Sequence, residues 1–174
     1  NDVIDGSLDS DAIDSYQHWM ADPDQALIYC RAQHAGSLGP GRTLARLVDL
    51  DNAQTLLDVG GGTGAMSIRL LEAYPKLNAT IIDFPNVAEI GWQFISEAGM
   101  VDRISYIPSN ALVAEWPKER DAILMSYLFS GIPGEDVPRM VEYSFDCLAP
   151  GGTFMIHDFM VENDRSGPPM AALW

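Results

Sequence analysis

Four residues in a short stretch have the types and the spacing of a ligand-binding loop: Asp58, Gly60, Gly62 and Gly64. Glycines at such positions let the backbone approach a bound molecule closely, at the point where a strand passes into a helix. A second acid, Asp83, follows 19 residues after Gly64 and ends the next apolar run. A carboxylate at that distance suits the two hydroxyl groups of a ribose. The pattern therefore indicates a nucleoside site.

Two kinds of nucleoside ligand fit this loop. Gly60, Gly62 and Ala65 satisfy a dinucleotide-binding fingerprint. With Asp58 included, the stretch satisfies the acid-x-G-x-G-x-G pattern of class I methyltransferases. Asp58 favours the second interpretation, because a carboxylate beside the loop repels a pyrophosphate and attracts the ammonium and sulfonium of S-adenosylmethionine (SAM). The expected cofactor is therefore SAM.

The stretch ILMSYLFSGIPGED, residues 123–136, differs from the glycine loop because most of it lacks acidic and basic residues. It has the pattern of a buried strand that runs into a loop, where an α/β enzyme places its chemistry. From Ile123 to Pro133 it contains no His, Asp, Glu, Lys or Cys. A reaction at this site therefore has to proceed without an acid or a base from this stretch.

The elements that must position these residues alternate between strand and helix. Strands are expected over 55–59, 78–84, 104–108, 121–129 and 153–159, and helices over 65–74, 85–98 and 135–148. Such alternation predicts an α/β fold, a Rossmann-like parallel sheet with helices on both faces. Helices over 12–23, 23–33 and 42–50, with a turn at 36–41, are expected to precede it. This divides the chain into a helical segment, 1–50, and a SAM-binding domain, 51–174.

Composition narrows the function class and the partners. The 174 residues suffice for one domain with a sizeable core, and the net charge of -15 argues against nucleic acid and anionic membranes as partners. No apolar run has the length of a membrane span. Cys30 and Cys147 are too few for a disulfide framework or a zinc site, so we expect free thiols in a reducing cytoplasm and no metal.

Several stretches together resemble one enzyme family. LLDVGGGTGAMSIRLLEAYPKLNATIIDFPNV, DAILMSYLFSGIPGED, LAPGGTFMIHD and the terminal PPMAALW are similar to the SAM-dependent O-methyltransferases of the plant caffeic acid and bacterial polyketide type. The resemblance implies a class I methyltransferase fold and a small-molecule acceptor. It also implies a longer, homodimeric protein with an N-terminal dimerisation domain and further C-terminal strands. The chain end agrees with this, because MAALW reads as an unfinished helix beside an uncovered sheet edge.

By position, the resemblance assigns the cofactor site to Asp58, Gly60, Gly62, Asp83, Phe84, Asn110, Met125 and Ser126. Phe84 is expected against the adenine. Asn110 stands where the family has an acid that meets the adenine amino group, and its amide oxygen can still accept that hydrogen bond. Backbone groups around Met125 and Ser126 are expected to line the sulfonium end.

The catalytic histidine of the family has no counterpart here. In the family it follows the fourth strand and takes the proton from the substrate hydroxyl, and its position falls on Ser130. Asp158 matches an acid that flanks that histidine, and it is either a weak base or a hydrogen-bonded acid at a strand end. His157 is expected on the opposite face of that strand as an ordinary core or surface residue.

A thioether acceptor would remove the need for a base, because its sulfur has a free lone pair and no proton to lose. Tyr29, Tyr127 and Phe129 are candidates to face the cationic product, and Arg31 is a candidate partner for a substrate carboxylate. Within the family, this resembles the methylthiohydroxybutyrate S-methyltransferases of dimethylsulfoniopropionate synthesis. S-methylation is therefore the favoured hypothesis.

Three other functions stay open. The second is O-methylation that uses Asp158 or a substrate that arrives ionised. The third is a SAM-binding protein without methyl transfer, which serves as a scaffold or catalyses a rearrangement. A dehydrogenase, which follows from the dinucleotide fingerprint alone, is the fourth.

Overall fold

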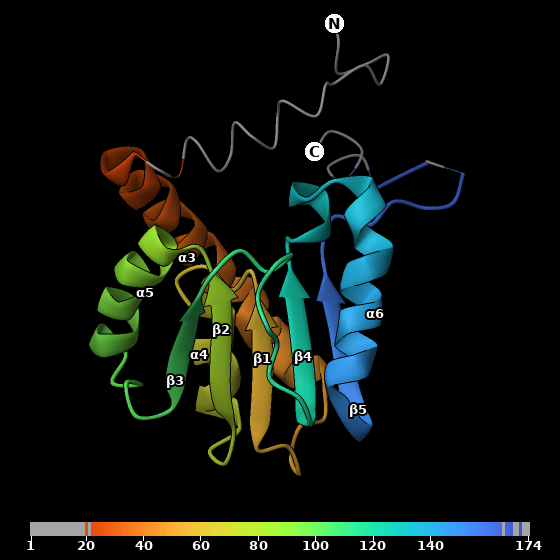
Figure 1. Cartoon of the computed structure of the whole chain (residues 1–174), viewed down its shortest axis with the longest axis horizontal. Helices are drawn as coiled ribbons and strands as arrows, with labels where there is room; N and C mark the ends of the chain where they lie inside the picture. The colour runs from red at the N-terminus through yellow and green to blue at the C-terminus, as the bar shows by residue number, and fades with distance from the viewer. Residues whose placement is uncertain (1–19, 21, 165, 169–170, 172–174) are drawn as a thin grey trace, which may run out of the picture.

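A five-stranded parallel sheet forms the centre of the molecule (Figure 1). The computed structural model describes residues 20, 22–164, 166–168 and 171. The strands lie in the order β3-β2-β1-β4-β5, and each pairs in parallel with its neighbours. They are β1 Thr55–Val59, β2 Asn78–Asp83, β3 Ile104–Pro108, β4 Arg120–Ser126 and β5 Leu148–His157. The predicted fold class is confirmed.

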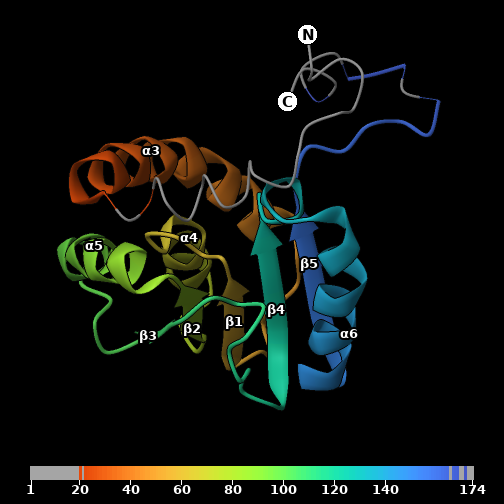
Figure 2. The same cartoon turned by 45° about the horizontal axis from the view of Figure 1, so that its top comes forward.

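Helices cover both faces of this sheet (Figures 1 and 2). One face carries α3 Pro23–Leu47, α4 Ala65–Ala73 and α5 Pro85–Glu97, and the other carries α6 Val137–Cys147. Short 3-10 helices follow β4, at η1 Phe129–Gly131 and η2 Gly134–Asp136. Right-handed crossovers explain the two faces, because the chain moves one way along the sheet from β1 to β3 and the other way from β4 to β5.

The central strands are buried on both faces, which explains their nearly continuous apolar sequences. Leu56 of β1 packs toward α4, where Leu70 belongs to the same core cluster. Leu57 and Ile123 point the opposite way and share a cluster with Met140 of α6. Alternate residues of one strand therefore serve two cores, as the period of a strand requires.

The first part of the chain differs from its prediction. α3 begins at Pro23 as expected, with the side chain of Asp22 capping its first turn. It then continues through 36–41, where the sequence predicted a turn, so that prediction was wrong. Gly41 is buried against α4, and a Cβ there would lie 3.0 Å from the Cβ of Arg69. Close packing of α3 on α4 thus outweighs the weak helix propensity of the glycines and proline.

The ends of β4 and β5 are also shifted. β4 was predicted to run to 129 but ends at Ser126, because Tyr127 adopts a left-handed backbone conformation with φ 54. β5 was predicted over 153–159 but spans Leu148–His157, with a register shift against β4 near Arg120. Both strands nevertheless end at the same edge of the sheet.

Some predictions lie outside the described residues or stay untested. The expected helix over 12–23 falls mostly on residues 1–19 and 21, and most of MAALW also lies outside. The boundary between 1–50 and 51–174 stays a prediction. In the described part of the chain, no helix is long and apolar enough to cross a membrane. Cys30 and Cys147 are buried free thiols, as expected.

Candidate functional site

The loop between β1 and α4 turns sharply because its alternating glycines adopt left-handed backbone conformations. The φ angles are 68 at Gly60, 57 at Gly62 and 77 at Gly64. Other residue types rarely adopt this region without cost. A Cβ at Gly60 would also lie 2.8 Å from Cδ1 of Leu128, which follows β4. The loop therefore lies close against the end of β4, and the glycine pattern has a conformational reason.

Asp83, at the end of β2, holds this loop in place. Its Oδ2 accepts the backbone N–H of Gly62 at 2.7 Å, and its Oδ1 accepts that of Phe84 at 2.8 Å. Burial raises the pKa of this carboxyl to about 6, against the lowering effect of the two N–H donors. Tyr106 of β3 donates its hydroxyl to the carbonyl of Gly62 at 2.7 Å. The carboxylate is thus fixed, and each oxygen keeps a lone pair for further donors such as ribose hydroxyls.

Asp58, within β1, is the most buried acid of the site. It is fully buried, and its Oδ2 accepts the hydroxyl of Ser67 at 2.6 Å, while its Oδ1 has no partner among the described residues. Burial raises the pKa of Asp58 to about 7, Ser67 lowers it, and the charge of Asp83 raises it further. A buried carboxylate oxygen without a donor is costly unless a ligand supplies one. A cationic or N–H-bearing ligand group fits this position.

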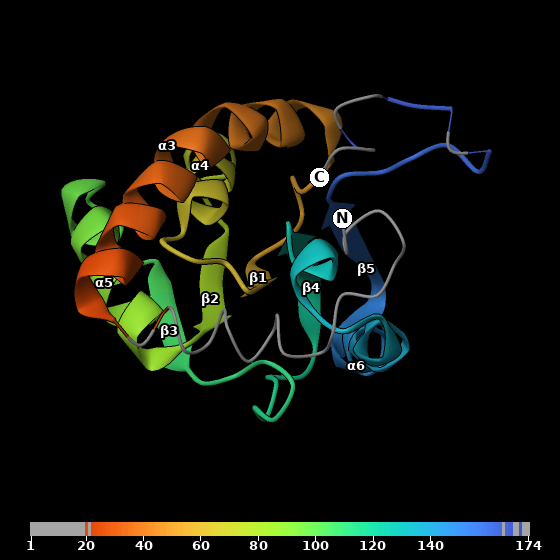
Figure 3. The ribbon, with the colours of Figure 1, turned by 90° about the horizontal axis from the view of Figure 1, so that it is seen from above.

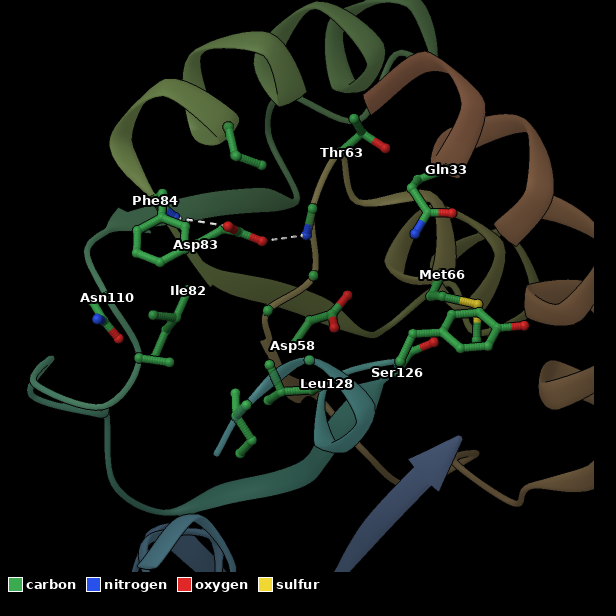
Figure 4. Close-up of a pocket in the computed structure, with 18 of the residues that line it drawn as sticks. Gln33, Asp58, Thr63, Met66, Ile82, Asp83, Phe84, Asn110, Ser126 and Leu128 are labelled. Atoms are coloured by element: carbon green, nitrogen blue, oxygen red, sulfur yellow. Dashed lines mark hydrogen bonds between the residues drawn. The ribbon is translucent and has the colours of Figure 1, made fainter. Parts of the chain in front are cut away.

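These residues line one cavity of about 220 Å³ (Figure 4). It lies at the carboxyl ends of the strands, the side from which Figure 3 views the sheet. Of the residues singled out from the sequence, the lining includes Tyr29, Asp58, Gly60, Gly62, Asp83, Phe84, Asn110, Ser126 and Tyr127. They come from α3, from β1, β2 and β4, and from the segments that follow β1, β2, β3 and β4. The structure thus brings together most of the predicted site.

The cavity has two ends, which differ in composition. The nucleoside end consists of Asp83, Phe84 and Asn110. The acceptor end consists of Ser126, Tyr127 and the lining residues after them, Leu128, Gly131 and Ile132. In Figure 4, Asp58 lies between Asp83 on one side and Ser126 on the other. A ligand with an adenosine at the nucleoside end would therefore extend past Asp58 toward the acceptor end.

Asn110 is partly engaged by the loop after β3. Its Oδ1 accepts the backbone N–H of Leu112 at 2.9 Å. This local bond orients the side chain and leaves the amide nitrogen and one oxygen lone pair for a ligand. Asn110 can therefore donate a hydrogen bond to an adenine edge or accept one from it.

Five of the predicted residues do not line the cavity: Arg31, Met125, Phe129, Ser130 and Asp158. Arg31 is exposed on α3, and the side chain of Met125 is buried in the core on the α6 side. Ser130 is exposed, and its backbone N–H donates to Oδ2 of Asp158 at 3.1 Å. Oδ1 of Asp158 accepts the N–H of Phe159 at 2.8 Å. Asp158 thus stabilises backbone at the strand end, and catalytic action by it or Ser130 stays a prediction.

Three residues that were not predicted to belong to the site lie in or beside it: Cys30, Gln33 and His157. Cys30 and Gln33 of α3 line the cavity beside Tyr29, and Nε2 of Gln33 donates to the hydroxyl of Tyr29 at 2.9 Å. Their spacing on one helix face would have revealed them. His157 lies against Ser126, with 2.9 Å between Nδ1 and Oγ. Only the pairing of β4 with β5 brings these two together.

Comparison with known proteins gives consistent matches. A model of the O-methyltransferase domain matches residues 11–174. The chain is 35% identical over 132 residues to 3-hydroxy-5-methyl-1-naphthoate 3-O-methyltransferase of Streptomyces sahachiroi, covering 76% of this chain and 38% of that protein. It is 28% identical over 160 residues to L-tyrosine C(3)-methyltransferase of Streptomyces lavendulae, covering 92% of this chain and 44% of that protein.

Solved structures agree with the sequence matches. Mitomycin 7-O-methyltransferase superposes with a TM-score of 0.82 at 25% identity, covering 91% of this chain and 45% of that chain. Human N-acetylserotonin methyltransferase in complex with SAM superposes with a TM-score of 0.81 at 21% identity, covering 91% and 45%, a likeness in fold alone. The chain thus spans less than half the length of the relatives it matches.

Proposed function

This chain belongs to the O-methyltransferase domain family, and from that premise we propose that it forms the SAM-binding part of a small-molecule methyltransferase. SAM supplies a methyl group on a sulfonium, ready for transfer to a nucleophile. In this proposal Asp83 accepts the ribose hydroxyls, Phe84 lies against the adenine, and Asp58 faces the ammonium. A dimer of the longer protein and a cytoplasmic location belong to the same proposal.

The observation that carries the proposal is the unpartnered oxygen of Asp58 in the same cavity as Asp83. Two carboxylates face this space, and among the described residues its lining includes no Lys, Arg or His. Such a lining disfavours the pyrophosphate of a dinucleotide and favours a nucleoside that carries positive charge. This supports SAM and argues against the dehydrogenase alternative.

For the acceptor, we favour S-methylation of a thioether acid such as methylthiohydroxybutyrate. Ser130 stands where the family pattern has the histidine base, and it is exposed rather than directed into the cavity. Within the described residues, the acceptor end includes no carboxylate and no imidazole in its lining. Methyl transfer to a thioether needs proximity and alignment but no proton acceptor. The ring of Tyr127 would face the sulfonium product.

O-methylation is the second candidate, and a specific observation favours it. The 35% identical relative carries the name of a 3-O-methyltransferase. An acceptor that arrives ionised needs no base, and Asp158 is the candidate base if one is required. Both oxygens of Asp158 already accept backbone N–H groups, so taking up a proton would compete with these bonds. A SAM-binding protein without methyl transfer is the third candidate.

Product analysis by mass spectrometry separates these candidates. The protein that contains this chain is incubated with SAM and either a methylthio hydroxy acid or a catechol-type phenol. We expect a methylated sulfonium and no methylated phenol, with Asp158→Asn retaining most of the activity. A methylated phenol alone, lost in Asp158→Asn, would overturn the S-methylation hypothesis. SAM binding without a product from either acceptor would favour the non-transferring protein.

A further inference from the structure

One pair of side chains at the acceptor end has no part in the function proposed above. The Oγ of Ser126 and the Nδ1 of His157 lie 2.9 Å apart. Ser126 lines the cavity, whereas His157 is not among the lining residues and lies behind it. The two residues are direct partners in the pairing of β4 with β5. Any influence of the imidazole on a ligand in the cavity would therefore pass through the serine hydroxyl.

The backbone beside this pair is strained and firmly held. Tyr127 has a φ of 54, a conformation that costs a non-glycine residue about 1 kcal/mol or more. Its N–H donates to the carbonyl of His157 at 2.7 Å. Its ring packs edge-on against the imidazole, with 4.6 Å between the centroids. Strain of this kind persists only where surrounding contacts over-determine it, so Ser126 and His157 are held in a fixed relation.

The tautomer and the charge of His157 together decide which way the Ser126 hydroxyl points. In the neutral Nε2–H tautomer, Nδ1 is an acceptor, so Ser126 donates its hydrogen to it and directs oxygen lone pairs elsewhere, whereas in the neutral Nδ1–H tautomer Ser126 accepts. In the protonated imidazole both ring nitrogens are donors. Ser126 then accepts from Nδ1, and its own hydrogen is free to face the cavity. One proton thus converts an acceptor at the cavity wall into a donor.

The surroundings of His157 keep it neutral near neutral pH. Burial lowers the pKa of His157, and the adjacent carboxylate of Asp158 opposes this to a smaller extent. Just after β4, the phenol of Tyr127 packs against the ring, and its own pKa is raised by burial and by Asp158. From β1, Asp58 faces the same cavity. The neutral form therefore prevails where the ordinary histidine pKa of about 6.5 would already allow some protonation.

We propose that His157, in its neutral Nε2–H tautomer, is a positioning residue that makes the acceptor end favourable for a sulfonium by turning the lone pairs of Ser126 toward the cavity. Protonation of His157 would replace those lone pairs with a hydroxyl hydrogen and place a positive charge behind it. The proposal rests on the proposed function, which places SAM in this cavity. It predicts a preference for SAM over S-adenosylhomocysteine (SAH) that depends on pH.

Isothermal titration calorimetry with SAM and SAH tests this directly, on the protein that contains this chain. Both ligands carry the ribose and the ammonium, so the contacts of these groups cancel in the ratio of the two affinities. Titration of Asp58, which also attracts the sulfonium, affects this ratio equally in the unaltered protein and in His157→Gln. They differ in the sulfonium charge and its methyl group. We expect the ratio to fall about threefold to tenfold between about pH 8 and about pH 5.5 in the unaltered protein. His157→Gln, which lacks the titrating imidazole, is expected to show a clearly smaller fall, and the difference between the two proteins reports His157.

A second variant keeps the test decisive if His157→Gln does not fold, which thermal unfolding reveals. Ser126→Ala removes the lone pairs and is expected to lower the SAM preference already at about pH 8, where His157 is neutral. A ratio that is constant with pH in the unaltered protein, or that falls equally in His157→Gln, would overturn the inference. An unchanged preference in Ser126→Ala would do the same. If neither SAM nor SAH binds at any pH, the proposed function itself fails.

Discussion

The two ends of the cavity are built in different ways. At the nucleoside end, the backbone N–H groups of Gly62 and Phe84 converge on one carboxylate, Asp83. At the acceptor end, the cavity wall depends on side chains, because Ser126 meets the imidazole of His157 across two strands. The first end is held by backbone geometry and the second by residue identity.

This difference explains how one end can change while the other stays constant. A backbone-defined site needs glycines and one acid, and almost any substitution there disturbs the fold of the loop. A site defined by side chains can exchange one residue for another without altering the sheet. Ser130, at the position where the family resemblance predicts a histidine, would be such an exchange, and it lies exposed in η1, away from the core. The reaction is therefore free to differ among proteins that share the cofactor site.

The largest effect is expected from Asp83→Ala, which would break the nucleoside end. The ribose hydroxyls would lose a charged acceptor, and the N–H groups of Gly62 and Phe84 would lose their partner. We expect the affinity for SAM to fall about 100-fold or more, since hydrogen bonds to charged groups contribute about 1.5–3 kcal/mol each. Calorimetric titration measures this, with Ser126→Ala as the comparison at the other end. A larger loss of SAM affinity in Ser126→Ala than in Asp83→Ala would show that the acceptor end contributes more to SAM binding than the nucleoside end.

An intermediate effect is expected from Gly91→Ala, which disturbs the nucleoside end from outside. A methyl group at Gly91 of α5 would overlap the phenol oxygen of Tyr106, which donates to the carbonyl of Gly62. We expect a loss of about 2 kcal/mol in the free energy of unfolding and weaker SAM binding.

Gly36→Ala is the matched control for this variant, because it lies in α3 with open space around it. It should gain up to about 1 kcal/mol through helix propensity alone. Urea unfolding measures both variants. Equal unfolding free energies of the two variants would show that the close approach of Tyr106 to Gly91 does not contribute to stability.

The last prediction concerns pH. The pKa values of Asp58 and Asp83 are raised to about 7 and about 6, so the folded protein binds more protons than the unfolded chain between their ordinary pKa and these values. Stability of the ligand-free protein is therefore expected to fall as pH rises from about 4 to about 7, by several kcal/mol, since one pKa unit corresponds to about 1.4 kcal/mol. SAM affinity should rise over the upper part of that range, as the carboxyls ionise.

Asp58→Asn sharpens this prediction, because the amide keeps an acceptor for Ser67 but carries no charge. We expect its unfolding free energy, measured in urea at several pH values, to change less with pH than that of the unaltered protein. Stability that instead rises with pH in the unaltered protein would contradict the raised pKa values.

Local patterns in the sequence were sufficient for much of the fold. The strands at 55–59 and 104–108 were predicted with the bounds that the structure shows, because a short apolar run between turn residues has few alternatives. The predicted turn at 36–41 was wrong. Its glycines and proline suggest a break in the helix when no partner helix is considered. In the structure, α4 supplies the packing that keeps α3 continuous.

The sequence by itself determined the glycine loop and the two acids beside it. Asp58, the glycines of the loop and Asp83 are close together in sequence, and their conformations follow from residue type and strand ends. Only the tertiary structure decided the acceptor end. It placed Phe129 and Ser130 outside the cavity lining, used Asp158 to hold backbone N–H groups, and brought His157 behind Ser126. The physical reason is the sequence separation of the interacting residues. The conformation of a turn is set by neighbouring residues. A side-chain pair across β4 and β5 depends on the register between the two strands, which no local pattern contains.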